Sequence, residues 1–291
     1  MAGAFVARRL EGQADVWVVA PTSYDRPAWL RYLLLLLGAV SARGRFSGVE
    51  GHFVLPSGPI ALLAARVRRI PLVVYAHGGD VREQAHANPL FAWLARRVLR
   101  GAAVVVTNSV AGAAEVRRFG AEAEIVPQGV DLSRFRPTPR PSQRRVLYLG
   151  GAAPAKGYEV ARTLADTLLG PGLQMVVHDD LPAVLAEHDV VLVPSHQEAF
   201  GLVAAEAIAA GRWVVARAVG GLPEVVEDGV NGTLVRDADF AAALAAVPDY
   251  DPLAVAATAA RFSIEAHRAA MNAIWSRVAA PSGQRRRSRG R

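Results

Sequence analysis

Short apolar runs alternate with segments of helical spacing along most of this 291-residue chain. The clearest run is Val190-Val191-Leu192-Val193, which is typical of a strand buried on both faces. By the same pattern, strands are expected near residues 15–20, 49–54, 71–76, 103–107, 123–127, 145–150, 173–178, 189–193, 213–216 and 233–235, with helices between most of them. Strands that alternate with helices predict an α/β protein with parallel, doubly wound sheets.

One apolar segment raises the question of a membrane span. It contains the run Leu33 to Leu37, is interrupted at Arg31 and ends by Ser41. Because about 20 apolar residues are needed to cross a bilayer, the segment predicts a buried helix instead.

A proline-rich stretch divides the chain. Pro137-Thr138-Pro139-Arg140-Pro141 cannot continue a helix or an interior strand, and we place the hinge between two domains there. The predicted parts are a first domain at 1–138, a second domain at 139–265, a C-terminal helix at 266–280 and a tail at 281–291.

Two glutamates stand around a strand-to-helix turn. Glu198 follows the 190–193 run, and Glu206 lies about one turn into a helical pattern that starts near Gly201. The amides of residues 200–203 then lie at a helix N-terminus, which attracts anions. Since the turn ends a parallel strand, it lies where open α/β sheets bind their ligands. The glutamates can accept hydrogen bonds from sugar and ribose hydroxyls while the amides face a diphosphate. Two solvated glutamates in a surface loop are the alternative.

The sequence gives little support for a metal site. Asp237 and Asp239 form an acid-x-acid pattern, but an alanine-rich helical segment follows, so helix capping is the expected role. The seven histidines show no paired spacing with acids of the kind found in closed metal sites. We therefore expect no bound metal.

Composition and charge narrow the class of protein. With 52% apolar residues, the chain suits two α/β domains that each bury a core. The absence of cysteine excludes a disulfide framework. Residues 1–10 include Arg8 and Arg9 and no sustained apolar core, so no secretory signal is expected and the predicted location is the cytoplasm.

The net charge of +7 resides largely at the end of the chain, in Arg285, Arg286, Arg287, Arg289 and Arg291. Without these five arginines the formal charge is about +2. We expect a disordered tail. Three uses for it are open: contact with anionic lipid at a membrane surface, nucleic-acid binding, and simple solubilisation. No aromatic residue accompanies the arginines to stack on bases, so nucleic acid is not expected as a partner.

Several motifs resemble one known family. The segment from His188 to Val235 contains HDVVLVPS, EAFGLVAAEAIAAG and VVARAVGGLPEVVEDGVNGTLV. It resembles the donor half of the retaining glycosyltransferases of family 4. Two upstream segments, GHFVLPSGPIALLAARVRRIPLVVYAHGGDV and IVPQGVDLSRFRP, resemble the acceptor domain and its link to the donor domain. The resemblance implies the GT-B fold, with two Rossmann-like domains facing across a cleft and a last helical pattern near 252–279 packed back on the first domain.

The resemblance also implies roles for individual residues. His77, Lys156 and Glu198 match catalytic positions. The positions that match donor-binding residues are Gly78, Asp80, Gly151, Phe200, Gly201, Leu202 and Glu206. Lys156 and the amides of residues 200–202 would stabilise the leaving diphosphate, and His77 would contact the sugar. Gly220 and Gly221 match a loop near the nucleoside, although turn chemistry explains them equally well.

The chain departs from the family pattern at three places. Gly151 stands where the family carries a second diphosphate cation, an arginine. The segment Phe5 to Ala20 resembles the family's first helix and second strand, so the first strand and its glycine-rich turn are not recognisable. The stretch from Leu173 to Asp189 is short by one strand-helix unit, and His178-Asp179-Asp180 replaces a glycine-rich turn. A truncated chain or an inactive relative would account for these departures.

The function that the resemblance implies is metal-independent transfer of a hexose or related sugar. The donor would be a nucleotide diphosphate sugar, no further cofactor would be needed, and the anomeric configuration would be retained. The acceptor hydroxyl can belong to a glycan, a lipid or a small molecule. Three alternatives stay open: a catalytically impaired nucleotide-sugar-binding or partner subunit, a sugar epimerase on a similar fold, and a basic nucleic-acid-associated protein.

Overall fold

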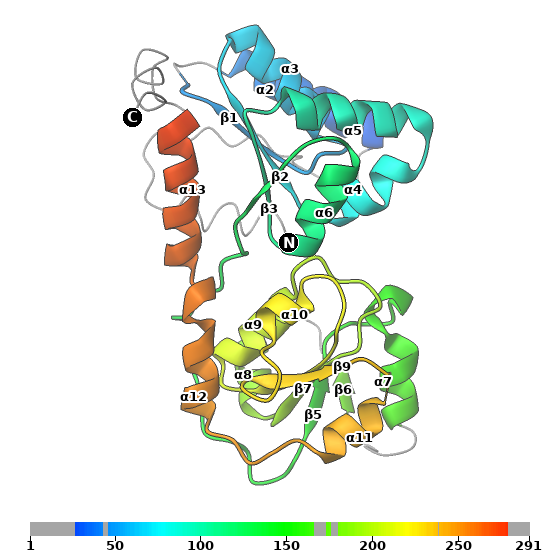
Figure 1. Cartoon of the computed structure of the whole chain (residues 1–291), viewed down its shortest axis with the longest axis vertical. Coiled ribbons are helices and arrows are strands. Elements are labelled where there is room, and N and C mark those ends of the chain that lie inside the picture. The colour runs from blue at the N-terminus through cyan, green and yellow to red at the C-terminus, as the bar shows by residue number, and fades with distance from the viewer. Residues whose placement is uncertain (1–26, 43–45, 166–172, 176–179, 238, 279–291) are drawn as a thin grey trace. The chain divides into compact units, whose positions relative to one another are not determined.

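The computed structural model describes residues 27–42, 46–165, 173–175, 180–237 and 239–278. The chain divides into two compact units (Figure 1), one formed by residues 1–126 with 268–291 and the other by residues 127–267. The expected strand near 15–20, the Arg-rich tail and His178-Asp179 lie outside the described residues. The change of unit falls at Pro127, and the hinge at 137–141 stays a prediction.

The first unit holds one sheet and a set of helices. Its strands are β1 (Val49–His52), β2 (Leu72–Ala76), β3 (Val104–Thr107) and β4 (Glu124–Ile125). Its helices are α2 (Ala28–Ser41), α3 (Gly58–Arg68), α4 (Gly79–Arg82), α5 (Pro89–Gly101) and α6 (Val110–Arg118), with a 3-10 turn at Gln84–His86. The strands are parallel and lie in the order β1-β2-β3-β4.

Alternate residues of these strands face two different cores, as the two-residue period of a strand requires. Leu72, Val74 and Val105 point into a cluster with α3 and α5. Val73, Tyr75 and Val106 point the other way and pack against Met271, Ile274 and Val278. These last three residues belong to α13 (Ile264–Val278), which begins in the second unit and continues into the first from Arg268. The end of the last helical pattern thus packs on the first domain, as expected.

The prediction for the leucine run is confirmed in part. Residues 28–41 form α2, as the apolar segment predicted. The expectation that this helix is buried is wrong, because Leu35 is its one buried residue among those whose burial is described, while Leu33, Leu34 and Leu37 are exposed. Five consecutive leucines point in all directions around a helix, so a single packed layer cannot cover all of them.

The second unit holds the other sheet. Its strands are β5 (Val146–Tyr148), β6 (Leu173–Met175), β7 (Val190–Val193), β8 (Trp213–Arg217) and β9 (Gly232–Val235). Its helices are α7 (Tyr158–Leu164), α8 (Leu181–Ala186), α9 (Leu202–Ala209), α10 (Leu222–Val225), α11 (Phe240–Ala245) and α12 (Pro252–Ala257), with 3-10 turns at Pro154–Lys156 and Thr258–Phe262. Asp239 caps α11 by accepting from Ala242 N at 3.0 Å, which confirms its expected role.

The strand order of this sheet fixes where a ligand can bind. The described strands are all parallel and lie in the order β6-β5-β7-β8-β9. The chain therefore moves outward from β5 to β6 and then returns to β7 on the other side of β5. The carboxyl ends of β5 and β7 form the switch point at which doubly wound sheets bind ligands.

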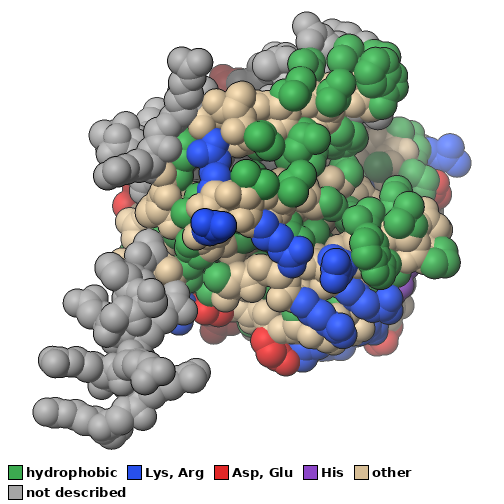
Figure 2. Space-filling model, turned by 90° about the horizontal axis from the view of Figure 1, so that it is seen from above, with side chains coloured by type: hydrophobic (Ala, Val, Ile, Leu, Met, Phe, Trp, Pro, Cys, Tyr) green, Lys and Arg blue, Asp and Glu red, His purple; other side chains and the backbone are tan. Residues whose placement is uncertain are grey.

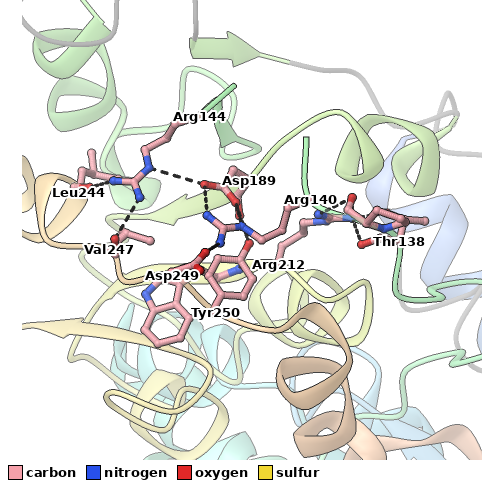
Figure 3. A network of polar contacts seen from close by, with 11 residues as sticks. Thr138, Arg140, Arg144, Asp189, Arg212, Leu244, Val247, Asp249 and Tyr250 are labelled. Carbon is pink, nitrogen blue, oxygen red and sulfur yellow. Dashed lines mark hydrogen bonds and ion pairs between the residues drawn. The ribbon is translucent and has the colours of Figure 1, made fainter. Parts of the chain in front are cut away.

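A polar network fastens the chain segment before β5 to the amino-terminal edge of this sheet, which lies opposite the switch point (Figure 3). Asp189, which precedes β7, accepts from Arg140 Nε at 2.8 Å and from the Tyr250 hydroxyl at 3.0 Å, and lies 3.6 Å from Arg144 Nε. Arg212 is fully buried and donates to Thr138 O at 2.8 Å. Hydrogen bonds to Asp189 are the main cause that raises the pKa of Arg140, so the guanidinium stays charged.

Candidate active site

Three loops of the second unit meet at the carboxyl edge of its sheet. They are residues 149–157, 194–201 and 218–221, and they follow the neighbouring strands β5, β7 and β8. The amide of His196 donates to Ala155 O at 2.9 Å, and the amide of Gly221 donates to Glu198 O at 3.2 Å. The middle loop, which carries Glu198, is therefore held by the loops on both sides.

Two glycines permit this close approach. Gly157 has φ +75°, and a Cβ there would lie 2.3 Å from Pro194 O. Gly220 has φ +56°, and a Cβ there would lie 1.7 Å from Glu198 O. A side chain at either position would push the loops apart, and both positions need a left-handed backbone that favours glycine.

The structure brings two of the predicted catalytic residues into direct contact. Lys156 Nζ lies 2.7 Å from Glu198 Oε2, although the residues are 42 positions apart in the chain. The hydroxyl of Ser195 donates to the same oxygen at 3.4 Å. The Glu198 side chain is 16% exposed and that of Lys156 is 41% exposed, so the ammonium is the more open member of the pair. In this structure the lysine charge is balanced by the glutamate.

The predicted helix N-terminus follows directly. Gly201, with φ +103°, precedes the first residue of α9, Leu202. The Phe200 side chain is buried and packs edge-on against Phe262 at a ring distance of 5.5 Å. Phe200 therefore fixes the turn through its side chain and can offer a ligand only its backbone. Glu206 is partly buried within α9.

Tyr148 and Arg217 support these loops, and the sequence did not single them out. The Tyr148 hydroxyl donates to Gly151 O at 3.0 Å and lies 3.4 Å from Lys156 O. Burial raises the pKa of Tyr148 to about 12, so the hydroxyl remains a donor at neutral pH. Arg217 Nε donates to Pro194 O at 3.3 Å. A polar side chain at or near the end of an otherwise apolar strand is the signal that would have found both.

The predicted residues of the first unit form a cluster of their own. His77 follows β2, and its ring lies 4.4 Å from that of Phe53 and 4.8 Å from that of Tyr75. Gly78 has φ +105° and starts the turn into α4. Asp80 is buried and accepts from His77 N at 3.1 Å and Val54 N at 2.6 Å. The Asp80 carboxyl thus shapes the backbone that carries His77.

A chain of polar contacts reaches His77 from β1. Glu50 Oε1 lies 3.0 Å from His52 Nε2, and His52 Nδ1 lies 3.0 Å from His77 Nε2. With Glu50 ionised and His52 neutral, His52 donates to Glu50 and accepts from His77. Trp275 Nε1 donates to the other oxygen of Glu50 at 2.9 Å. The sequence did not single out Glu50 and His52, although His52 ends the strand next to the one that His77 follows.

Comparison with family models decides the family. Residues 3–129 match the model described as glycosyl transferase 4-like domain, and residues 132–248 match the one described as glycosyl transferases group 1. Together the two matches cover most of the chain and correspond to its two sheets. The chain belongs to the GT-B glycosyltransferases.

Curated relatives of this GT-B chain include two proteins named D-inositol 3-phosphate glycosyltransferase. The one from Geodermatophilus obscurus is 34% identical, over 70% of this chain and 60% of the relative. The one from Mycobacterium marinum is 31% identical, over 74% of this chain and 58% of the relative. The chain therefore spans less than two thirds of the length of these relatives.

Solved structures show the same GT-B architecture. Sucrose-phosphate synthase from Thermosynechococcus elongatus matches with a TM-score of 0.69 and 22% identity, over 89% of this chain and 81% of that chain. The Anabaena protein HepE in complex with UDP-glucose matches with a TM-score of 0.64 and 21% identity, over 76% of each chain. The expected fold class is confirmed.

Two features are absent from the described residues of this GT-B chain. No helix in those ranges is long and apolar enough to cross a membrane. Within the same ranges, no group of three or more His, Asp or Glu side chains is placed to hold a metal ion.

Proposed function

We propose that this GT-B chain transfers a sugar from a nucleotide diphosphate sugar to an acceptor hydroxyl, with retention at the anomeric carbon and without a metal. The observation that carries the proposal is the meeting of Lys156 and Glu198 at the switch point of the second sheet, next to the N-terminus of α9. Two opposite charges and a row of helix amides at this edge suit a ligand that combines hydroxyls with a diphosphate.

The ion pair suggests how a donor would be held. On donor binding, the Lys156 ammonium exchanges the Glu198 carboxylate for a diphosphate oxygen, and Glu198 accepts from a sugar hydroxyl instead. Lys156 and the amides of residues 200–202 then stabilise the charge that develops on the departing diphosphate. Glu206 accepts from a ribose hydroxyl. Catalysis of this kind rests on position and electrostatics and needs no protein nucleophile.

His77 is proposed to contact the transferred sugar, with Gly78 letting the backbone approach. Asp80 contributes to the proposed site by shaping the turn that carries His77, because its carboxylate accepts hydrogen bonds from two backbone amides. Glu50 and His52 are placed to fix the orientation and the tautomer of the His77 ring.

Donor binding is the first test. A panel of UDP-, GDP- and ADP-sugars that includes UDP-glucose is titrated into the full chain by calorimetry. At least one donor should bind, and Lys156→Ala and Glu206→Ala should each weaken it about 10- to 100-fold, since each removes a hydrogen bond that involves a charged group. Arg162→Ala, which removes an exposed cation from α7, should leave the affinity unchanged. Equal affinity in the wild type and in Glu206→Ala would contradict the proposed donor site.

Turnover is the second test. D-inositol 3-phosphate is the first acceptor to try, because the curated relatives carry it in their names. Proton NMR of the product reports the anomeric configuration, and assays with and without EDTA report metal use. An inverted product would contradict the retaining mechanism, and loss of activity in EDTA would contradict metal independence.

One observation favours a non-catalytic nucleotide-sugar-binding protein as the second candidate. In this structure the charge of Lys156 is balanced by Glu198, and Gly151 offers no second cation beside it. Donor binding without product above an enzyme-free control, across the acceptor panel, would support this candidate.

A further inference from the structure

The outer helices of the first unit carry an unusual share of exposed apolar side chains. Of the fourteen large hydrophobic residues that are exposed in the described part of the chain, ten lie on α2, α3 and α5. They are Trp29, Leu33, Leu34, Leu37, Val40, Leu63, Val67, Leu90, Phe91 and Trp93. Trp29, Val67 and Leu90 are each at least 60% exposed. Helix α3 packs against both α2 and α5, so the three helices form one layer.

The charges of this layer are all positive. The sequences of α2, α3 and α5 contain no aspartate and no glutamate. Arg66, Arg69, Arg96, Arg97 and Arg100 lie on or directly after α3 and α5 and are exposed. None of these five forms an ion pair with another residue in the described ranges. Elsewhere in the unit, Arg117 and Arg118 are paired with Glu122 and Glu115.

Figure 2, which views the molecule from this end, shows hydrophobic side chains gathered beside a row of Lys and Arg side chains. We call the ten apolar residues and five arginines named above the apolar–arginine face. Monomeric soluble proteins rarely expose apolar patches that extend over several elements, and such patches mark a binding surface. A partner for this face therefore needs both an apolar part and an anionic part.

An anionic bilayer surface matches this chemistry better than a second copy of the chain. A partner copy docked on the same face would bring the arginines against one another with no acid from these helices to separate them. At a bilayer, Trp and Leu side chains enter the boundary between headgroups and acyl chains, while arginines meet lipid phosphates. Arg97 stacks over Trp93 with a distance of 5.3 Å from Cζ to the ring centroid, which places a cation beside an aromatic ring suited to that boundary.

We infer that the apolar–arginine face docks this protein peripherally on membranes that contain anionic phospholipid. The face belongs to the folded first unit and is separate from the Arg-rich tail. It is also independent of the proposed sugar transfer, so either inference can fail without the other.

Sedimentation with vesicles tests the inference on the full chain. The protein should pellet with phosphatidylcholine vesicles that contain about one third phosphatidylglycerol and much less with pure phosphatidylcholine. Arg96→Gln with Arg97→Gln should lower the partition coefficient at least tenfold, since each arginine near an anionic surface contributes about a factor of five. Arg117→Gln with Arg118→Gln removes the same charge from α6 and should change it by less than about twofold.

A second pair of variants tests the apolar part. Leu37→Ser with Val67→Ser should reduce binding to anionic vesicles, while circular dichroism and thermal melting confirm that the fold is kept. A chain that lacks residues 281–291 should still show the difference between wild type and the Arg96/Arg97 variant. Binding that depends on the tail alone would overturn the inference. So would an effect of Leu37→Ser with Val67→Ser on oligomeric state, measured by light scattering, without an effect on vesicle binding.

Discussion

Asp80 is an acidic side chain held where water does not reach. Its two oxygens accept from the amides of Val54 and His77, yet burial dominates and raises the pKa of its carboxyl to about 6. Removal from water disfavours the charged form more than the backbone hydrogen bonds favour it. The group is therefore mostly ionised at pH 7 in a place that prefers it neutral.

This shift predicts a pH dependence of stability. A pKa raised from 3.8 in the unfolded chain to about 6 in the folded protein gives a stabilising contribution that is complete below pH 3.8 and is lost as the pH rises through 6. The wild type should therefore lose about 2 kcal/mol relative to Asp80→Asn between pH 4 and pH 7. Urea unfolding of both proteins across this range measures the difference.

The matched control is Glu122→Gln, since Glu122 is 81% exposed. Its difference from the wild type should stay flat over the same pH range. A flat difference for Asp80→Asn as well would mean that the carboxyl is not desolvated in the folded protein.

At the residue scale, sequence reasoning found the residues with recognisable motifs and missed their supports. Lys156 and Glu198 were predicted separately, and the structure shows them in contact. Their contact could not be read from the sequence, because it depends on the register of β5 and β7 and on two glycine turns. Glu50 accepts from Trp275, which lies 225 positions later in the chain, so no local pattern marks Glu50. Tyr148 does carry a local signal, because it is a polar residue at the end of the apolar strand β5.

At the scale of elements, the nine strands expected in the described residues are all present, and the apolar runs are the reason. Strands β2, β5, β7 and β8 are buried along nearly their whole length, so the composition of their runs identifies them, whereas β1 and β4 are only partly buried. The leucine run of α2 identified a helix for a similar reason but gave no periodicity to show which side is covered. Burial of a uniformly apolar helix depends on its neighbours, and the sequence does not specify them.

The Asp189 network holds the segment before β5, so a substitution of Asp189 should destabilise the second unit. The Asp189 side chain is 3% exposed and is engaged by Arg140, Arg144 and Tyr250. Asp189→Asn removes the charge and leaves guanidinium groups without their partner, so it should lower the free energy of unfolding by about 2–4 kcal/mol. Chemical denaturation measures this loss.

A neighbouring acid provides the comparison for Asp189. Glu187 is 63% exposed and lies 3.6 Å from Arg145. Glu187→Gln should change the free energy of unfolding by less than about 0.5 kcal/mol, because exposed ion pairs contribute little. Similar losses in the two variants would show that the network is no stronger than a surface pair.

At the scale of the whole molecule, the first unit is discontinuous in sequence. One face of its sheet is completed by Met271, Ile274 and Val278 from the end of α13. Ile274→Ala should therefore destabilise the first unit by about 2–4 kcal/mol through the cavity it leaves. Hydrogen exchange should become faster in β2 and β3 and stay unchanged in β7 and β8.

Asn272→Ala, which alters an exposed residue of the same helix, is the control for Ile274→Ala and should leave both sheets protected. Equal acceleration in β2 and β7 would show that the two units unfold together, and the division into separate cores would then be wrong.

The late position of α13 in the chain also affects biosynthesis. The second unit is encoded without interruption, so it can fold on the ribosome as soon as residue 267 has left the exit tunnel. Val73, Tyr75 and Val106 emerge much earlier but do not meet Met271, Ile274 and Val278 until α13 is translated. During that interval the nascent chain exposes one apolar face of the first sheet. Chaperones that bind apolar strands can recognise this face.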